Sequence, residues 1–171
     1  MYFSVFRIQI MDPSSAPRHD PNYPFHAPLH MAAKGCDLET VQQMVEGGGS
    51  WAVWPVNVTD NLDRIPLHEA ARNVGGQGTA ILEYLLSKGA DIGAKMVNGD
   101  TPLHIASSKG LKKNVEVLVR HGADPTATNF NGKTPHDVAS KPEIQKILVD
   151  AEESQRIRSG LPPTTLIEGP F

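Results

Sequence analysis

Thr101-Pro102-Leu103-His104-Ile105-Ala106 is the stretch that decides the fold, because variants of it recur along the chain. Related segments are Ala27-Pro28-Leu29-His30, Ile65-Pro66-Leu67-His68 and Thr134-Pro135-His136-Asp137. The four copies begin at residues 27, 65, 101 and 134, so their spacings are 38, 36 and 33 residues. A fixed period of this length indicates a repeat protein in which each unit is one small supersecondary element.

The third copy has the features of a helix start. The Thr101 hydroxyl can accept a hydrogen bond from a free backbone N–H, and Pro102 suits the first helical position. Leu103, Ile105 and Ala106 are expected to face inward. A second helix is predicted by the apolar spacing of Val115, Val117, Leu118 and Val119. It should end at Gly122, and Asn131-Gly132 should form the next tight turn.

A second element, Lys88-Gly89-Ala90-Asp91, recurs in phase as His121-Gly122-Ala123-Asp124. Together the motifs resemble the ankyrin repeat, which has a T-P-L-H-x-A signature and a period of about 33 residues. The resemblance covers about residues 22 to 151. It implies an all-α solenoid of stacked helix-turn-helix units with hairpin-like turns. It also implies that His30, His68 and His104 hydrogen-bond backbone near the turns and are structural.

We expect the repeat domain at 22–152, between flexible segments at 1–21 and 153–171. The predicted repeats are about 22–59, 60–95, 96–128 and 129–152. The last one is short, and its segment Ser140-Lys141-Pro142-Glu143 is predicted to be a capping box that opens the closing helix. Ala27 and Ile65 replace the usual threonine, so the first two units should have looser helix starts.

Two insertions lengthen the period. The first, Gly75-Gly76-Gln77-Gly78, is predicted to be a flexible link between two helices. The second, residues 47–55, carries Trp51 and Trp54 and should emerge on the hairpin side. These tryptophans could cover the wider gap between the first two repeats, or they could anchor a partner; the sequence leaves both interpretations open.

The composition excludes several classes of function. The net charge is −3, and the 16 Lys and Arg residues are scattered, which argues against nucleic-acid binding. The single cysteine, Cys36, excludes an intrachain disulfide and fits an intracellular location in the cytoplasm or nucleus. The chain has no apolar run near the roughly 18 residues that a membrane helix needs, and Met1–Ile10 does not resemble a signal peptide.

No pattern of catalytic residues is evident. Successive repeats should hold their histidines too far apart for a metal site, because zinc ligands must all lie about 2 Å from one ion. His136 stands in the usual leucine position and is expected to be partly exposed. Cys36 is expected at a helix corner, and no His and Asn follow it at the spacing of a thiol enzyme. Nucleotide-binding and hydrolase motifs are also missing. We therefore predict no enzyme activity, no cofactor, no metal and no small-molecule substrate.

The expected function is protein–protein binding, as an adaptor or scaffold, by a monomer. The resemblance implies contacts from hairpin tips and from the first helix of each repeat: Tyr23, His26, Lys34, Asn61, Leu62, Arg64, Arg72, Asn73, Val97, Asn98, Asp100, Ser108, Lys109, Phe130, Asn131 and Lys133. Leu62, Val97 and Phe130 could form an apolar strip. The basic residues on this face favour an acidic or mixed-charge partner segment.

Three alternatives stay open at this point. The chain could be an inhibitory or regulatory subunit that covers an enzyme surface. It could be an enzyme or metal protein that uses histidine and Cys36, although no spacing favours this. It could also self-associate through Met1–Ile10.

Overall fold

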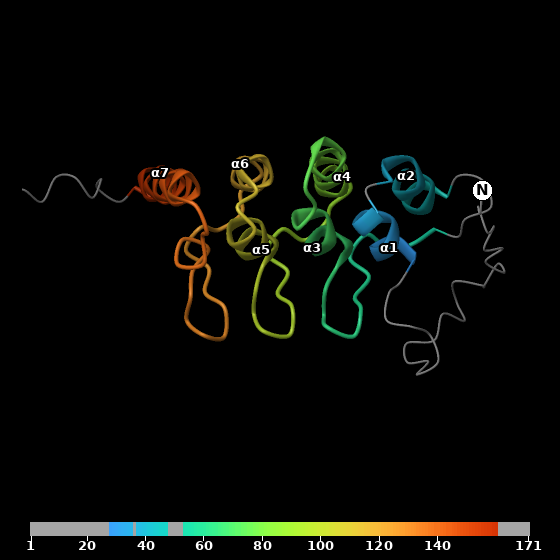
Figure 1. The fold of residues 1–171 in the computed structure, drawn as a ribbon, viewed down its shortest axis with the longest axis horizontal. Coiled ribbons are helices and arrows are strands. Elements are labelled where there is room, and N and C mark those ends of the chain that lie inside the picture. Colours follow the sequence, from blue (N-terminus) through green and yellow to red (C-terminus); the bar gives the residue numbers. More distant parts are fainter. Residues whose placement is uncertain (1–27, 36, 48–52, 161–171) are drawn as a thin grey trace, which may run out of the picture.

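The computed structural model describes residues 28–35, 37–47 and 53–160, and these residues form helices and loops without a strand (Figure 1). Tyr23, His26, Ala27, Cys36 and Trp51 lie outside the described residues. Seven helices lie within the described residues: α1 (Pro28–Gly35), α2 (Leu38–Glu46), α3 (Pro66–Ala71), α4 (Gly76–Ser87), α5 (Pro102–Ser108), α6 (Lys112–Arg120) and α7 (Pro142–Arg158).

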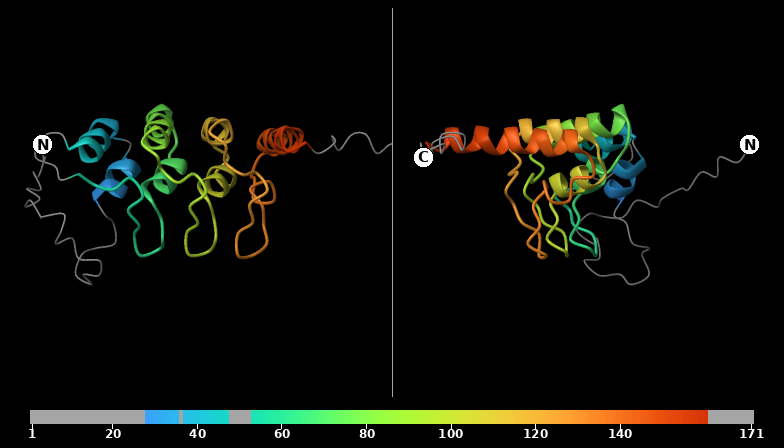
Figure 2. Two further views of the ribbon diagram at one scale, coloured as in Figure 1. Left: turned by 180° about the vertical axis from the view of Figure 1, so that it is seen from behind. Right: turned by 60° about the vertical axis from the view of Figure 1, so that its left-hand side comes forward.

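The helices stack in two rows. Helices α1, α3 and α5 form an inner row, and α2, α4, α6 and α7 form an outer row (Figure 1). Each helix contacts its neighbours along the row, and α1, α3 and α5 also contact α2, α4 and α6 respectively. The loops that join the repeats project as hairpin-like turns from the same side of the stack (Figure 2). The predicted all-α solenoid is confirmed.

The signature leucine of each of the first three units fills the space between the rows. Leu29, Leu67 and Leu103 are completely buried. They pack in one continuous core with apolar residues of the outer helices, namely Val41, Met44, Ile81, Leu82, Leu85, Val115, Leu118, Ile144 and Leu148. No single helix pair could cover these side chains, so the stack is held together by contacts between neighbouring repeats.

The signature histidines tie each repeat to the next one. His104 accepts a hydrogen bond from Thr101 N–H at Nδ1, and its Nε2 lies 3.0 Å from the Lys133 carbonyl oxygen. His68 repeats this arrangement with Ile65 N–H and the Ala94 carbonyl oxygen. Since Nδ1 accepts, the proton lies on Nε2 of a neutral ring, which donates to the carbonyl. The buried rings therefore have the structural role that the resemblance implied.

The helix starts agree in part with the sequence. Thr101 Oγ1 accepts from His104 N–H, and Pro102 occupies the first turn of α5, as predicted. Ile65 has no side-chain cap, but the bond from its N–H to His68 Nδ1 retains half of the capping arrangement. In the fourth repeat the first helix is replaced by a turn, where Asp137 Oδ2 accepts from Thr134 N–H at 2.8 Å.

The glycine insertion is not a flexible link, so that prediction is wrong. Helix α4 begins at Gly76, and Gly78 lies in its first turn. Gly78 is buried against the loop before the helix: a Cβ atom there would lie 2.6 Å from Asn73 Cβ. The glycine therefore permits a close approach of helix and loop, and only Gly75, with φ of 111°, provides the sharp turn.

The C-terminal end of the stack also differs from the prediction. Helix α7 continues to Arg158, so residues 153–158 are helical and not part of a flexible tail. Glu, Gln and Arg are good helix formers, and Arg156 and Arg158 stand at the end of the helix that favours positive charge. Lys141 occupies the N-cap position without a side-chain hydrogen bond, so the predicted capping box at Ser140 does not form.

Trp54 lies between the first and second repeats. Its side chain is half-buried against the core, and the backbone N–H of Trp54 donates to the Met44 carbonyl oxygen at 2.8 Å. For this tryptophan the structure favours packing over display to a partner. None of the described helices is both long and apolar enough to cross a membrane.

Candidate protein-binding surface

Three hairpin tips have the same backbone closure. The N–H of the first tip residue donates to the carbonyl oxygen of the fifth at 3.0 Å, and this bond joins Asp60 to Arg64, Met96 to Asp100 and Asn129 to Lys133. Side-chain oxygens inside the tips add further bonds. Asn129 Oδ1 accepts from Asn131 and Lys133 N–H, and Asp60 Oδ1 accepts from Leu62 and Arg64 N–H. The tips are therefore well-defined loops.

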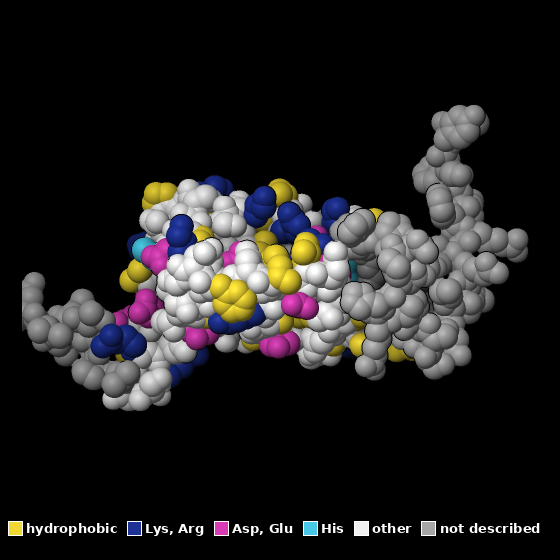
Figure 3. All heavy atoms as spheres, turned by 90° about the horizontal axis from the view of Figure 1, so that it is seen from below, with side chains coloured by type: hydrophobic (Ala, Val, Ile, Leu, Met, Phe, Trp, Pro, Cys, Tyr) yellow, Lys and Arg dark blue, Asp and Glu magenta, His cyan; other side chains and the backbone are white. Residues whose placement is uncertain are grey.

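Neighbouring tips are also bonded to one another. Val97 N–H donates to the Leu62 carbonyl oxygen at 3.0 Å, and Phe130 N–H donates to the Asn98 carbonyl oxygen at 3.1 Å. The exposed fractions of Leu62, Val97 and Phe130 are 38%, 47% and 74%. We call these three residues the tip row. Apolar side chains gather on the face that carries the tips, with basic and acidic groups around them (Figure 3).

The position of Phe130 depends on a glycine. Its ring lies against Gly99, where a Cβ atom would come within 2.6 Å of Phe130 N and 2.9 Å of the ring. Gly99 also has φ of 82°, which glycine adopts without strain. Phe130 thus packs on the neighbouring tip with one face and leaves most of its ring exposed.

Most of the predicted contact residues within the described residues are exposed. The exposed ones are Lys34, Asn61, Leu62, Arg72, Val97, Asn98, Ser108, Lys109, Phe130, Asn131 and Lys133. Arg64, Asn73 and Asp100 are half-buried. Tyr23 and His26 lie outside the described residues, so their assignment stays a prediction.

Arg64 is committed to the interior. Its guanidinium contacts Asp60 Oδ2 at 2.7 Å and Glu69 Oε1 at 2.6 Å, and the side chain is only 11% exposed. Glu69 is 1% exposed and also faces Arg72, whose Nη1 lies 3.7 Å from Glu69 Oε2. A buried carboxylate needs such a partner, because an unpaired one would cost several kcal/mol. Arg64 thus stabilises the second repeat and is not an open contact residue.

Asn73 and Asp100 are likewise held by neighbours. The Asn73 amide donates to the Ala33 carbonyl oxygen of the first repeat. Asp100 accepts from the amides of Asn98 and Asn129, each at 2.7 Å. Both residues have structural bonds that a partner would have to compete with.

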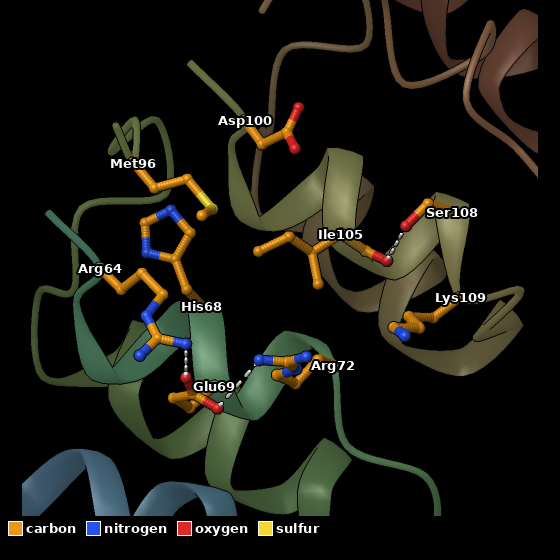
Figure 4. A pocket seen from close by; sticks show the side chains of 9 residues that line it. All are labelled: Arg64, His68, Glu69, Arg72, Met96, Asp100, Ile105, Ser108 and Lys109. Atoms are coloured by element: carbon orange, nitrogen blue, oxygen red, sulfur yellow. Dashed lines mark hydrogen bonds and ion pairs between the residues drawn. The ribbon is translucent and has the colours of Figure 1, made fainter. Parts of the chain in front are cut away.

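A small groove opens between the second and third repeats (Figure 4). We call it the inter-repeat groove. Its volume is about 170 Å³, and its lining residues are Arg64, His68, Glu69, Arg72, Met96, Asp100, Ile105, Ser108 and Lys109. Met96 and Ile105 are both half-buried, so Ile105 borders the groove and does not point into the core as predicted.

Sequence reasoning missed Glu69, Met96 and Ile105 as parts of this surface. From the sequence alone, all three residues look like ordinary core or surface positions of a repeat. One signal was available: Glu69 and Ile105 occupy the same variable position of the T-P-L-H-x-A segment, and Met31, half exposed on α1, is the third member of that series.

The pKa shifts agree with this structural reading. Burial lowers the pKa of His30 and His68 below 6.5, so both rings are neutral near pH 7. Burial alone would raise the pKa of Asp60, but hydrogen bonds from Arg64 and Leu62 outweigh it and lower the pKa below 3.8. Asp60 is therefore ionised and compensated.

The described residues hold no cluster of three or more His, Cys, Asp or Glu side chains that could bind a metal ion. His136 is half-buried beside Asp137, with a distance of 4.0 Å between His136 Nδ1 and Asp137 Oδ1. The face that carries the hairpin tips and the inter-repeat groove combines apolar, basic and hydrogen-bonding groups. Such a surface is suited to recognition of another macromolecule.

Comparisons with known proteins agree with the repeat pattern. The sequence model of a family described as "Ankyrin repeats (3 copies)" matches residues 7–96 and 76–158. Ankyrin repeat domain-containing protein 53 of Mus musculus is 36% identical over 84 residues, which are 48% of this chain and 16% of that protein. BRCA1-associated RING domain protein 1 of Caenorhabditis elegans is 41% identical over 81 residues, 47% of this chain and 10% of that protein.

NF-kappa-B inhibitor alpha of Gallus gallus is 36% identical over 94 residues, which are 53% of this chain and 27% of that protein. The match thus spans between 10% and 27% of the length of these three relatives. The similarity therefore covers only a small part of each of these longer proteins.

Proposed function

The chain belongs to the ankyrin-repeat family, and from this premise we propose that it is a non-enzymatic module that binds another protein. The binding surface is the tip row together with the exposed ends of the inner helices. The proposed role is that of an adaptor or scaffold, which acts as a monomer inside the cell, in the cytoplasm or nucleus. The single cysteine supports an intracellular location.

The tip row is the observation that carries the proposal. Three exposed apolar side chains lie on adjacent tips that are bonded backbone to backbone. Exposed apolar groups held in fixed positions lose little conformational freedom on binding, so their burial is available as binding free energy. Phe130 is the strongest single candidate, because aromatic residues near the centre of an interface often dominate its affinity.

The test is affinity capture from cell lysate with three forms of the full chain. The first is wild type, and the second carries Leu62→Ser, Val97→Ser and Phe130→Ala. The third carries Val149→Ser and Ile157→Ser, which remove exposed apolar side chains from α7 in the outer row, away from the tips.

We expect the tip variant to lose a partner that the wild type and the α7 variant both retain. All three forms should melt within a few degrees of one another, because exposed apolar residues contribute little to stability. Equal capture by the tip and wild-type forms would contradict the proposed surface. Loss of capture only in the α7 form would move the site to the outer row.

A second candidate function is inhibition of an enzyme or regulator by covering its surface. The likeness to NF-kappa-B inhibitor alpha, a protein named as an inhibitor, favours this candidate. The two functions are separated by adding purified wild-type chain to the captured partner. Loss of the partner's activity at stoichiometric amounts identifies an inhibitor, and unchanged activity with a stable complex identifies an adaptor.

A further inference from the structure

We propose that the inter-repeat groove binds an extended partner segment in which an acidic residue adjoins an aliphatic one. The carboxylate would lie between Arg72 and Lys109, and the aliphatic side chain would rest against Met96 and Ile105. This inference rests on the proposed function and specifies the chemistry of the partner at one part of the surface.

Two cations that line the groove, Arg72 and Lys109, are exposed. Arg64 contacts the buried carboxylates of Asp60 and Glu69 at 2.7 and 2.6 Å, and Arg72 supplies the second positive charge that balances these two acids. Arg72 lies 3.7 Å from Glu69, too far for a strong hydrogen bond, and 40% of its side chain is exposed. The exposed part of its guanidinium, a planar fork of N–H donors, can still donate to a partner carboxylate.

Lys109 provides the second cation. It is exposed at the C-terminal end of α5, and among the described residues its ammonium group has no hydrogen bond or ion pair. Figure 4 shows Arg72 and Lys109 at the same end of the groove, with Ile105 pointing between them and Met96. The proposed carboxylate lies at this end, on the side of the two cations.

The opposite end of the groove has different chemistry. Asp100 lies there, beside Met96 and near the hairpin tip, and it carries a negative charge (Figure 4). Because Glu69 is buried and bound by Arg64 and Arg72, the exposed cations lie at the helix end of the groove, and the carboxylate of Asp100 lies at the tip end. This polarity favours one local acid over a run of acids, and it fixes the direction in which the segment crosses the groove.

The groove is small. Its whole volume of about 170 Å³ is similar to the roughly 150 Å³ of a cavity that holds one benzene molecule, so it has room for no more than one aliphatic side chain against Met96 and Ile105. Met96 has a flexible thioether that can adapt to branched or linear partners. Leu, Ile, Val or Met beside the acid is therefore the expected neighbour.

The experiment starts from a library of random 12-residue peptides displayed on phage and selected on the immobilised full chain. Enriched sequences are then made as fluorescein-labelled peptides, and their binding is measured by fluorescence anisotropy. Three forms of the chain are compared: wild type, an Arg72→Gln/Lys109→Gln variant, and a Lys112→Gln/Lys113→Gln variant. The last is the matched control, because it removes the same charge from exposed lysines of α6 that do not line the groove.

We expect enrichment of Asp or Glu next to an aliphatic residue. Binding to the Arg72→Gln/Lys109→Gln variant should be at least about tenfold weaker, as for loss of charge-assisted hydrogen bonds. The matched control should bind like wild type. A charge-reversed Arg72→Glu/Lys109→Glu variant should instead select basic peptides.

Two results would overturn the inference. One is enrichment of peptides that lack the acid–aliphatic pair or that bind both glutamine variants equally; the other is no enrichment at all. Neither result touches the proposed function, because loss of capture in the tip variant is measured separately. If capture also failed to depend on the tips, the proposed function itself would be wrong.

Discussion

Replacement of Arg64 by alanine should destabilise the protein far more than replacement of Arg72, although both arginines belong to the same repeat. Arg64 is 11% exposed and is shared between two carboxylates, Asp60 and Glu69, whose side chains are 2% and 1% exposed. Without the guanidinium, two negative charges would be buried next to one another. Arg72 is 40% exposed and only 3.7 Å from Glu69, so its loss leaves Arg64 in place to compensate that carboxylate.

The size of the effect follows from this geometry. Removal of one partner from a buried ion pair typically costs about 3–5 kcal/mol. Asp60 keeps its backbone bonds from Leu62 and Arg64 N–H, so the lower half of this range applies. About 3 kcal/mol corresponds to a fall in melting temperature of roughly 6–12 °C for a domain of this size. Arg72→Ala should cost less, about 1 kcal/mol, because Arg72 is 40% exposed and lies 3.7 Å from Glu69.

The assay is urea unfolding of the wild type and the two variants, followed by circular dichroism at pH 7 and at pH 3. Hydrogen bonds to Arg64 keep the folded-state pKa of Asp60 below 3.8, so this pairing stabilises the wild type above that pH and is lost as the pH falls further. The gap between wild type and Arg64→Ala should therefore narrow at low pH. An equal gap at both pH values, or equal effects of the two arginines at pH 7, would refute the electrostatic explanation.

Two further predictions concern stability. Burial lowers the pKa of His30 and His68 below 6.5, so the unfolded chain binds more protons near pH 6 and the free energy of unfolding should fall as the pH drops through 6.5. A His30→Gln/His68→Gln variant should show a shallower dependence between pH 7.5 and 5.5, and an unchanged slope would contradict this. Gly78→Ala should destabilise by about 1–3 kcal/mol, because its methyl group would lie 2.6 Å from Asn73 Cβ. Gly76→Ala lies in the same helical turn, and its added Cβ would meet nothing within 4 Å, so it should be neutral or slightly stabilising. Equal melting temperatures of the Gly78→Ala and Gly76→Ala variants would show that the loop shifts to make room for the methyl group at residue 78.

The repeat architecture could be predicted because its determinants are local and recur. Pro102 and Leu103 define a helix start and a core position within a few residues, and the same signals return at each repeat. The helical insertion at Gly76 could not be predicted in this way. Glycine is equally suited to a flexible link and to a close contact, and only the position of Asn73 in space decides between them.

The candidate site was predictable to a smaller extent. Exposure of Leu62, Val97 and Phe130 followed from their positions at the tips of a repeat whose geometry is known. The inter-repeat groove did not follow, because its floor combines Met96 from a hairpin with Ile105 from a helix. Contacts between elements depend on how closely neighbouring repeats stack, and a single sequence does not state the spacing between them.

The two arginines of the second repeat show why surface composition alone cannot define a partner. A count of basic residues on this face treats Arg64 and Arg72 alike, yet the charge of Arg64 is already compensated by the buried acids. Only Arg72 can add a partner carboxylate without first breaking a strong pair. The buried Glu69 thus has two consequences: it makes one arginine part of the fold, and it holds the other beside the groove (Figure 4). A partner should therefore contact the second repeat at Arg72. Substitutions at Arg64 should weaken binding only because they destabilise the folded state.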